Sequence, residues 1–176
     1  MADIERFMRG AHIVSRLVEQ ILERGYLRRA SRDRVTFDQL NILKFLARPP
    51  VKLVKHVAGF LSASYAAASK AVDRLEAKGL VRCATCERDR RAEVVEVTPK
   101  GQRLIRTYER YKRNRLRVAL RGRNPDELAE GLERVIVALM REREVAGNPC
   151  LGCGAYYASE CVSRAHGHPC AAAACE

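Results

Sequence analysis

Apolar residues recur at three- and four-residue steps along the first 22 positions of the chain. The set is Ile4, Phe7, Met8, Ala11, Val14, Leu17, Val18, Ile21 and Leu22. This spacing puts the apolar side chains on one face of an α-helix, with arginines and glutamates on the other. The sequence predicts one long amphipathic helix that ends either at Gly25 or in the polar run from Arg28 to Arg34.

Two shorter helices are predicted next. Thr36 and Gln39 stand at the spacing of a capping box, and the Arg48-Pro49-Pro50 stretch prevents the helix behind them from continuing. A third helix is predicted from its inward-facing apolar residues, and a tight Ser62-Ala63 turn ends it. Those apolar residues are Val54, Val57, Ala58 and Leu61.

A fourth helix begins at Ser64, a residue suited to capping, and Gly79 occupies the position of a C-cap glycine. Its spacing turns Ala68, Ala71, Val72 and Leu75 inward. Tyr65, Ala66, Ser69, Lys70 and Arg74 remain on or near the outer face. With Ser64, these are the residues of the helix predicted to bind DNA. Small residues near its start would let the backbone approach DNA base edges closely.

A basic hairpin is predicted after that helix. Leu80-Val81 opens a strand that Val95 and Val97 can pair with, and residues 82–91 lie between the strands. The hairpin tip contains Arg88, Arg90 and Arg91, together with Cys83, Cys86 and Asp89. The three arginines are predicted to bind DNA by following the phosphates or entering a minor groove. A helix-turn-helix followed by such a hairpin predicts a winged helix-turn-helix over residues 34–98, in a mainly α fold with a small β wing. The alternative to a DNA-reading helix is an alanine-rich core helix, and the alternative to a DNA-binding wing is a solvated hairpin tip without a partner.

Two more helices are predicted in residues 99–146. One begins at Pro99 and ends near Gly122, and the next begins at Asn124, with Pro125 in its first turn and Glu127 at capping-box spacing. Their apolar residues are Leu104, Tyr108, Tyr111, Leu116, Leu128, Leu132, Val135, Ile136 and Leu139. With residues 1–30, these helices are too apolar to stay in water, which predicts a helical dimerisation region, with an intramolecular bundle as the alternative.

The formal net charge is +12, and arginine carries most of the excess. Such a charge suits a nucleic acid, although a ribosomal protein or an anionic membrane surface would fit it equally. The many arginines between Arg103 and Arg121 favour a solvated face over a DNA contact.

No apolar run approaches the roughly 20 residues of a membrane span, and the chain start has no signal core, so a cytoplasmic location is expected. No nucleophile with a base, and no pair of acids, can be assembled from these motifs, so no enzyme is expected.

The middle of the chain resembles the MarR family of bacterial transcription regulators. The resemblance is carried by residues 64–81, by the Asp89-Arg90-Arg91 wing and by Thr98-Pro99-Lys100-Gly101. It implies a homodimer whose recognition helices enter successive major grooves of a pseudopalindromic operator, with the wings at the flanking minor grooves. It also implies a switch that responds to a signal, with a pocket between the dimer helices and the winged helix for a small-molecule effector.

The last 30 residues, 147–176, are unusually rich in cysteine. They contain Cys150, Cys153, Cys161, Cys170 and Cys175, along with His166 and His168. Two thiolates separated by two residues can bind one metal ion, so Cys150-Leu151-Gly152-Cys153 predicts a metal knuckle, which Cys161 and Cys170 would complete. Cys175 or a histidine could replace one of these ligands. Four such ligands suit either zinc or an iron–sulfur cluster, and the spacing does not decide between them. Unliganded reactive thiols are the alternative.

A second CxxC pair, Cys83 and Cys86, lies at the predicted wing. The pair could sense oxidants directly or donate ligands to a metal shared with the tail. No βαβ pattern surrounds it, which disfavours a thioredoxin-like oxidoreductase.

Two function classes follow. The favoured one is a sequence-specific DNA-binding regulator that acts as a homodimer, with repression as the expected effect. Its cysteine-ligated metal site would sense redox or metal state. The alternative is an architectural nucleic-acid-binding protein without sequence preference, whose tail holds a structural zinc. Loss of binding on scrambling the operator bases would distinguish them.

Overall fold

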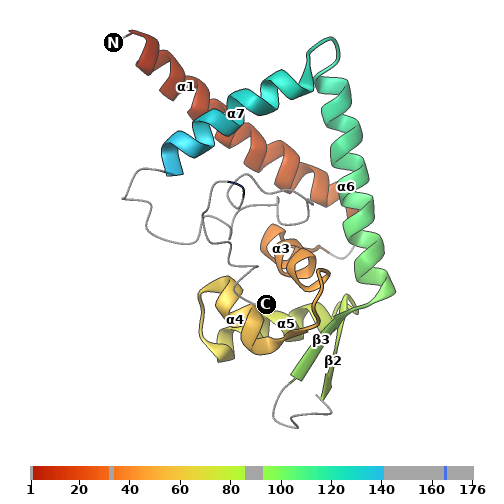
Figure 1. Cartoon of the computed structure of the whole chain (residues 1–176). Helices are drawn as coiled ribbons and strands as arrows, with labels where there is room; N and C mark the ends of the chain where they lie inside the picture. The colour runs from red at the N-terminus through yellow and green to blue at the C-terminus, as the bar shows by residue number, and fades with distance from the viewer. Residues whose placement is uncertain (1, 32–33, 86–92, 141–164, 166–176) are drawn as a thin grey trace.

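The computed structural model describes residues 2–31, 34–85, 93–140 and 165. It begins with three helical segments joined end to end, namely α1 (Ala2–Leu17), the π-helical η1 (Val18–Gly25) and α2 (Tyr26–Ala30) (Figure 1). Gly25 does not end the helix, because its φ of −66° and ψ of −44° are helical. The end comes at Ser31, whose φ of −122° and ψ of 126° are extended. The prediction of an end at Gly25 is therefore wrong, and the prediction of an end in the polar run is confirmed.

The predicted capping box at the start of α3 (Phe37–Leu46) is confirmed. The backbone N–H of Gln39 donates to Thr36 Oγ1, the N–H of Thr36 donates to Gln39 Oε1, and both distances are 3.2 Å. Leu40, Leu43 and Phe45 of this helix are completely buried. After the prolines comes β1 (Lys52–Leu53), a two-residue strand that the hydrophobic pattern did not predict.

α4 (Val54–Leu61) and α5 (Tyr65–Glu76) form the predicted helix-turn-helix. Ser62 makes the turn in the left-handed conformation, with a φ of 50°. His56, at the third position of α4, accepts a 3.0 Å hydrogen bond at Nδ1 from the backbone N–H of Leu53. The imidazole therefore satisfies one of the unpaired N–H groups at the start of the helix.

Three antiparallel strands in the order β1-β3-β2 complete this part of the chain. β2 (Val81–Thr85) pairs with β3 (Glu93–Val97), with Val81 opposite Val97 and Cys83 opposite Val95. Two expectations need correction. Leu80 precedes the strand, since its N–H donates to Leu75 O at the end of α5, and residues 82–85 belong to β2 because they pair with β3 rather than forming the tip.

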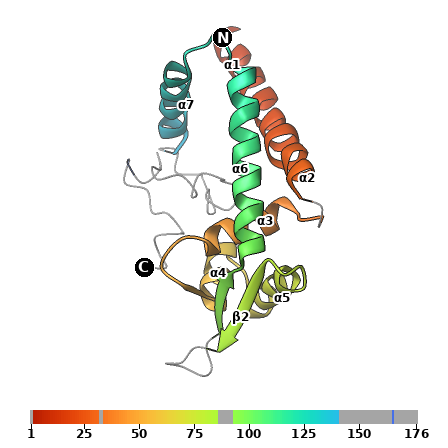
Figure 2. The ribbon, with the colours of Figure 1, turned by 90° about the vertical axis from the view of Figure 1, so that its right-hand side faces the viewer.

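α6 (Pro99–Ala119) is capped by Thr98, whose Oγ1 accepts from the N–H of Gly101. Leu104, Ile105 and Tyr108 of its first half are buried in the same core as α3, α4, α5 and the sheet. The second half leaves that core and leads to α7 (Pro125–Met140), where Asn124 Oδ1 accepts from the N–H of Asp126. Figure 2 shows α1 and α7 on opposite sides of α6.

We call α3, α4, α5 and the three strands the winged-helix lobe, and α1 and α7 the helical arms. The architecture is mainly α-helical with a small antiparallel sheet, that is, a winged helix-turn-helix with helical extensions. Within the described residues, no helix is both long and apolar enough to cross a membrane.

Candidate nucleic-acid interface

The helix predicted to read DNA is α5. Ser64 Oγ accepts a 3.3 Å hydrogen bond from the N–H of Ala67 and so caps the helix. One face is buried through Ala68, Val72 and Leu75. On the other face the side chains of the predicted contact residues Tyr65, Ala66, Lys70 and Arg74 are exposed, and that of Ser69 is half-buried. Their contact with DNA stays a prediction.

α5 is held from behind by aromatic and aliphatic packing. The rings of Phe45 in α3 and Phe60 in α4 stack with centroids 4.4 Å apart. Gly79 follows α5 with a φ of 66°, a conformation that favours glycine, and lets the chain turn into the sheet. The outer face of α5 is therefore presented by a rigid support.

The charges on this outer face are open to a partner. Neither Lys70 nor Arg74 forms an ion pair within the described part of the chain, whereas Arg82 on β2 is held 2.6 Å from Glu96 on β3. Glu76, the last residue of α5, accepts from the N–H of Cys83 at 2.7 Å, which draws this carboxylate toward the sheet. The exposed cations suit phosphate or base-edge contacts.

The tip of the wing lies outside the described residues. Arg88, Arg90, Arg91 and Cys86 all fall there, so their predicted roles stay predictions. Cys83 is half-buried on β2, and its pKa is raised to about 11 by burial first and then by Glu76, Glu93 and Asp73. Because the thiolate is the reactive form, Cys83 alone is a poor nucleophile at neutral pH.

The predicted metal ligands also lie outside the described residues. They are Cys150, Cys153, Cys161, Cys170 and Cys175, with His166 and His168 as alternates. In the ranges that are described, no three His, Cys, Asp or Glu side chains are grouped so as to hold a metal ion.

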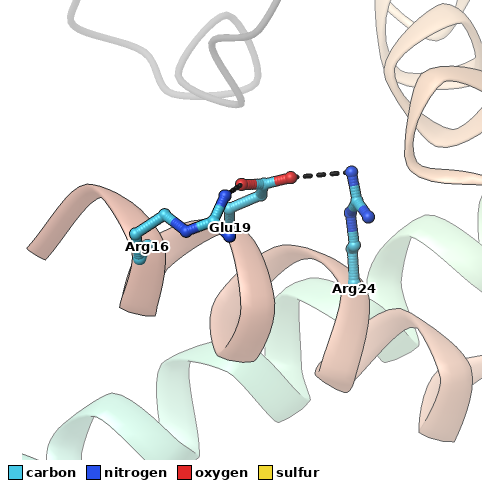
Figure 3. Close-up of polar contacts among 3 residues, drawn as sticks. All are labelled: Arg16, Glu19 and Arg24. Atoms are coloured by element: carbon cyan, nitrogen blue, oxygen red, sulfur yellow. Dashed lines mark hydrogen bonds and ion pairs between the residues drawn. The ribbon is translucent and has the colours of Figure 1, made fainter. Parts of the chain in front are cut away.

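A hollow of about 490 Å³ lies between the η1–α2 segment and α3. Glu19 stands at its edge between two arginines, 3.4 Å from Arg16 and 2.7 Å from Arg24 (Figure 3). Asn41 also lines the hollow, although the residue is only 2% exposed, and neither side-chain amide atom has a hydrogen-bond partner. Burial, followed by Glu19, raises the pKa of Glu23, another lining residue. An unpaired buried amide beside a hollow is costly unless a ligand or water satisfies it.

A buried charge cluster joins α3 to α6. Lys44 is 0% exposed, and its Nζ lies 2.6 Å from Glu109 Oε1; Lys112 Nζ lies 2.9 Å from the other oxygen of the same carboxylate. Burial would raise the pKa of Glu109, but hydrogen bonding and charge from Lys44 and then Lys112 outweigh it and lower that pKa. Sequence reasoning missed this cluster; the available signal was a lysine inside the apolar run from Leu40 to Leu46.

Comparisons with known proteins agree with the fold. The model of the MarR family matches residues 35–92. The chain is similar to Streptococcus pneumoniae FabT in complex with DNA, with 19% identity, a TM-score of 0.62, and coverage of 76% of this chain and 97% of that one. It is also similar to a MarR family transcriptional regulator from Streptomyces coelicolor in complex with DNA, at 23% identity and a TM-score of 0.61, covering 80% and 87% of the two chains.

A third similar structure is the transcriptional regulator BldR from Sulfolobus solfataricus. Its identity is 26% and its TM-score 0.54, over 78% of this chain and 99% of that one. No curated protein has a sequence that matches this chain. The family match therefore covers the winged-helix lobe from α3 to β2 but not β3, and the structural likeness extends the fold to the helical extensions.

Proposed function

We propose that this chain is a sequence-specific DNA-binding transcription regulator of the MarR type, acting as a repressor without enzymatic activity. The observation that carries the proposal is the exposed outer face of α5, with Tyr65, Lys70 and Arg74 presented by a packed helix-turn-helix. The family match over residues 35–92 and the DNA complexes of two similar structures support it. In this arrangement α5 enters the major groove, and the arginines at the wing tip follow the flanking minor groove.

The regulator acts as a homodimer on a pseudopalindromic operator. Its support is the apolar surface that the chain leaves uncovered on the helical arms, where Ile4, Met8, Leu132 and Leu139 are between 56% and 59% exposed. A twin chain would cover these residues with matching ones and place two α5 helices about one turn of DNA apart.

The cysteine-rich tail forms a metal site. Cys150, Cys153, Cys161 and Cys170, with Cys175 as an alternate, hold either zinc or an iron–sulfur cluster. Zinc would stabilise the tail, and a cluster would add a response to oxygen, iron or redox state. Metal and acid-labile sulfide analysis of protein purified without oxygen or chelator distinguishes the two. Full metal content in a Cys153→Ser variant would rule out this ligand set.

A small-molecule effector is a second signal that would control DNA binding. The hollow beside α3, with the unpaired amide of Asn41 in its wall, is the place in the described residues that supports it. A ligand bound there would contact both the N-terminal helix and the winged-helix lobe, so it could change their relative position.

The test of the central proposal is selection of duplexes from a random pool by the full chain, followed by competition with scrambled versions. A regulator should bind the selected duplex at least a thousandfold more tightly, about the lower end for specific DNA-binding proteins. Equal affinity for both duplexes, with a steep loss on adding salt, would instead indicate the architectural protein that binds without sequence preference.

A further inference from the structure

The winged-helix lobe is joined to α6 by a charge cluster as well as by apolar packing. Lys44 from α3 and Lys112 from α6 hold the two oxygens of Glu109 at 2.6 and 2.9 Å. The side chain of Lys44 is 0% exposed, that of Glu109 17% and that of Lys112 24%. The ring of Tyr108 lies beneath both ammonium groups, 5.6 Å from Lys44 Nζ and 5.2 Å from Lys112 Nζ.

The cluster lies at the point along α6 where the angle of the helix to the lobe is set. Glu109 follows Tyr108, the last buried residue of α6, and the outward side chains of the next turns are exposed. The cluster therefore lies where α6 leaves the core of the lobe and continues toward α7. A change in the angle at this point would move the arms relative to α5.

Stability alone does not explain such a cluster. Burying an ion pair costs desolvation energy that its attraction only partly returns, and apolar replacements of similar size are often as stable. An apolar contact can slide at little cost, whereas Lys44 has to stay beside Glu109, because separating a buried pair leaves an uncompensated charge. The cluster is therefore better suited to fixing an angle than to adding stability.

We propose that Lys44, Glu109 and Lys112 are positioning residues that fix the angle between the winged-helix lobe and α6, and thereby select the spacing between operator half-sites. This inference rests on the proposed function, since it requires a dimer on a two-part operator. α6 continues for 10 residues beyond Glu109, which is about 15 Å, so a tilt of about 15° at the cluster displaces its far end by about 4 Å. That exceeds the rise of one base pair, about 3.4 Å, so a small tilt is enough to change which spacing fits.

The experiment compares the wild type with a Lys44→Met, Glu109→Leu double variant on the duplex selected by the full chain. The duplex is remade with one base pair removed from, or one or two added to, the segment between its half-sites, and a single half-site is measured separately. The matched control is an Arg82→Met, Glu96→Leu double variant, which removes an exposed pair of the same 2.6 Å length from the same lobe.

The wild type and the control should lose about tenfold in affinity for each one-base-pair change, because both the distance and the rotation between half-sites are altered. The double variant should lose about threefold or less, while its affinity for the single half-site is unchanged. A wild-type spacing profile in the double variant would overturn the inference, and so would an equal loss of affinity at every spacing.

If circular dichroism shows that the double variant is unfolded, Lys44→Met alone decides the matter. It removes the ion pair between α3 and α6 and leaves Glu109 paired with Lys112 on its own helix. A broader spacing profile supports the inference and an unchanged one overturns it. Failure of the wild type to select any sequence is a distinct result, because it rejects the proposed function and the inference with it.

Discussion

The winged-helix lobe and the helical arms differ in how much of their apolar surface the chain covers by itself. In the lobe, Leu40, Leu43, Phe45 and Val57 are 0% exposed. In the arms, apolar residues of similar size remain open to solvent, as the 59% exposure of Ile4 shows. The lobe is complete as one chain, whereas the arms carry an apolar stripe of the kind that marks an interaction site.

This difference separates two tasks within one chain. The apolar residues of the lobe pack into its core, and the outer face of α5 stays polar and exposed. The arms leave their apolar residues exposed in the single chain, as the proposed contact with a second chain requires. Substitutions in the lobe should therefore change the stability of a single chain, and substitutions in the arms should change association.

The largest effect is expected from Gly101→Ala, at the point where α6 packs on the lobe. A Cβ at this position would meet the carbonyl oxygen of Leu80, and Val97 Cγ1 at 2.7 Å. Such a conflict involves backbone and should lower the free energy of unfolding by about 3 kcal/mol. Denaturant unfolding measures it.

The matched control is Gly59→Ala in α4, where a Cβ meets nothing within 4 Å. Alanine stabilises an open helical position, so this variant should gain about 0.5 to 1 kcal/mol. Equal destabilisation by the two variants would contradict the packing described for Gly101.

A charge in the arms should break the proposed association without unfolding the lobe. Leu132 on α7 is 56% exposed in the single chain, and Leu132→Glu would place a carboxylate in an apolar contact between chains. The dimer dissociation constant should rise about thirtyfold or more, as for an interface hot spot. Sedimentation at several concentrations measures it, with Arg134→Glu on the polar face of α7 as the control. An unchanged constant for Leu132→Glu would place the dimer contact elsewhere.

Two substitutions in the DNA-binding region should have different consequences. Lys70→Ala on the outer face of α5 should reduce discrimination between base pairs, by about 1 to 3 kcal/mol at the position contacted. Arg90→Ala should weaken binding to all sequences and lower the salt slope by about one. Titrations on matched and mismatched duplexes at several salt concentrations measure both effects. The same pattern for both variants would contradict the division between base and phosphate contacts.

The smallest effect concerns His56 and the start of α4. Burial first, and then Lys55 and Lys52, lower the pKa of His56 from its ordinary value of 6.5. The folded chain thus prefers neutral imidazole, whose Nδ1 accepts from the N–H of Leu53. The stability this gives is present above pH 6.5 and is lost as the pH falls through the lowered pKa.

His56→Ala should cost about 1 kcal/mol at pH 8, the usual value of a helix cap, and less at low pH. His56→Gln keeps a neutral acceptor and should reduce the loss of stability between pH 7 and pH 5. Thermal unfolding across this range measures the difference. A wild-type pH profile in the His56→Gln variant would show that another group is responsible.

Local signals predicted the parts of the fold that depend on neighbouring residues. Thr36 with Gln39, Ser64 and Thr98 each mark a helix start by a hydrogen bond spanning three residues, and Gly79 marks a turn. These interactions are complete within one segment, so the sequence contains all that they require.

The features that sequence analysis missed depend on residues distant in the chain. β1 exists because Lys52 and Leu53 pair with Val95 and Val94. Lys44 is buried because Glu109, 65 positions later, neutralises it. A lysine in isolation is expected at the surface, so neither partner reveals the other. The surroundings of Asn41 likewise depend on distant residues, because the hollow that it lines is formed by η1 and α2 as well as by α3.

The most direct test of the account is hydroxyl-radical footprinting of the selected duplex, together with the number of chains bound to it. The account predicts two chains per duplex and two protected segments about one helical turn apart, both lost when Ser69 and Lys70 are replaced by alanine. Protection that is continuous and independent of sequence, or a single chain per duplex, would contradict it.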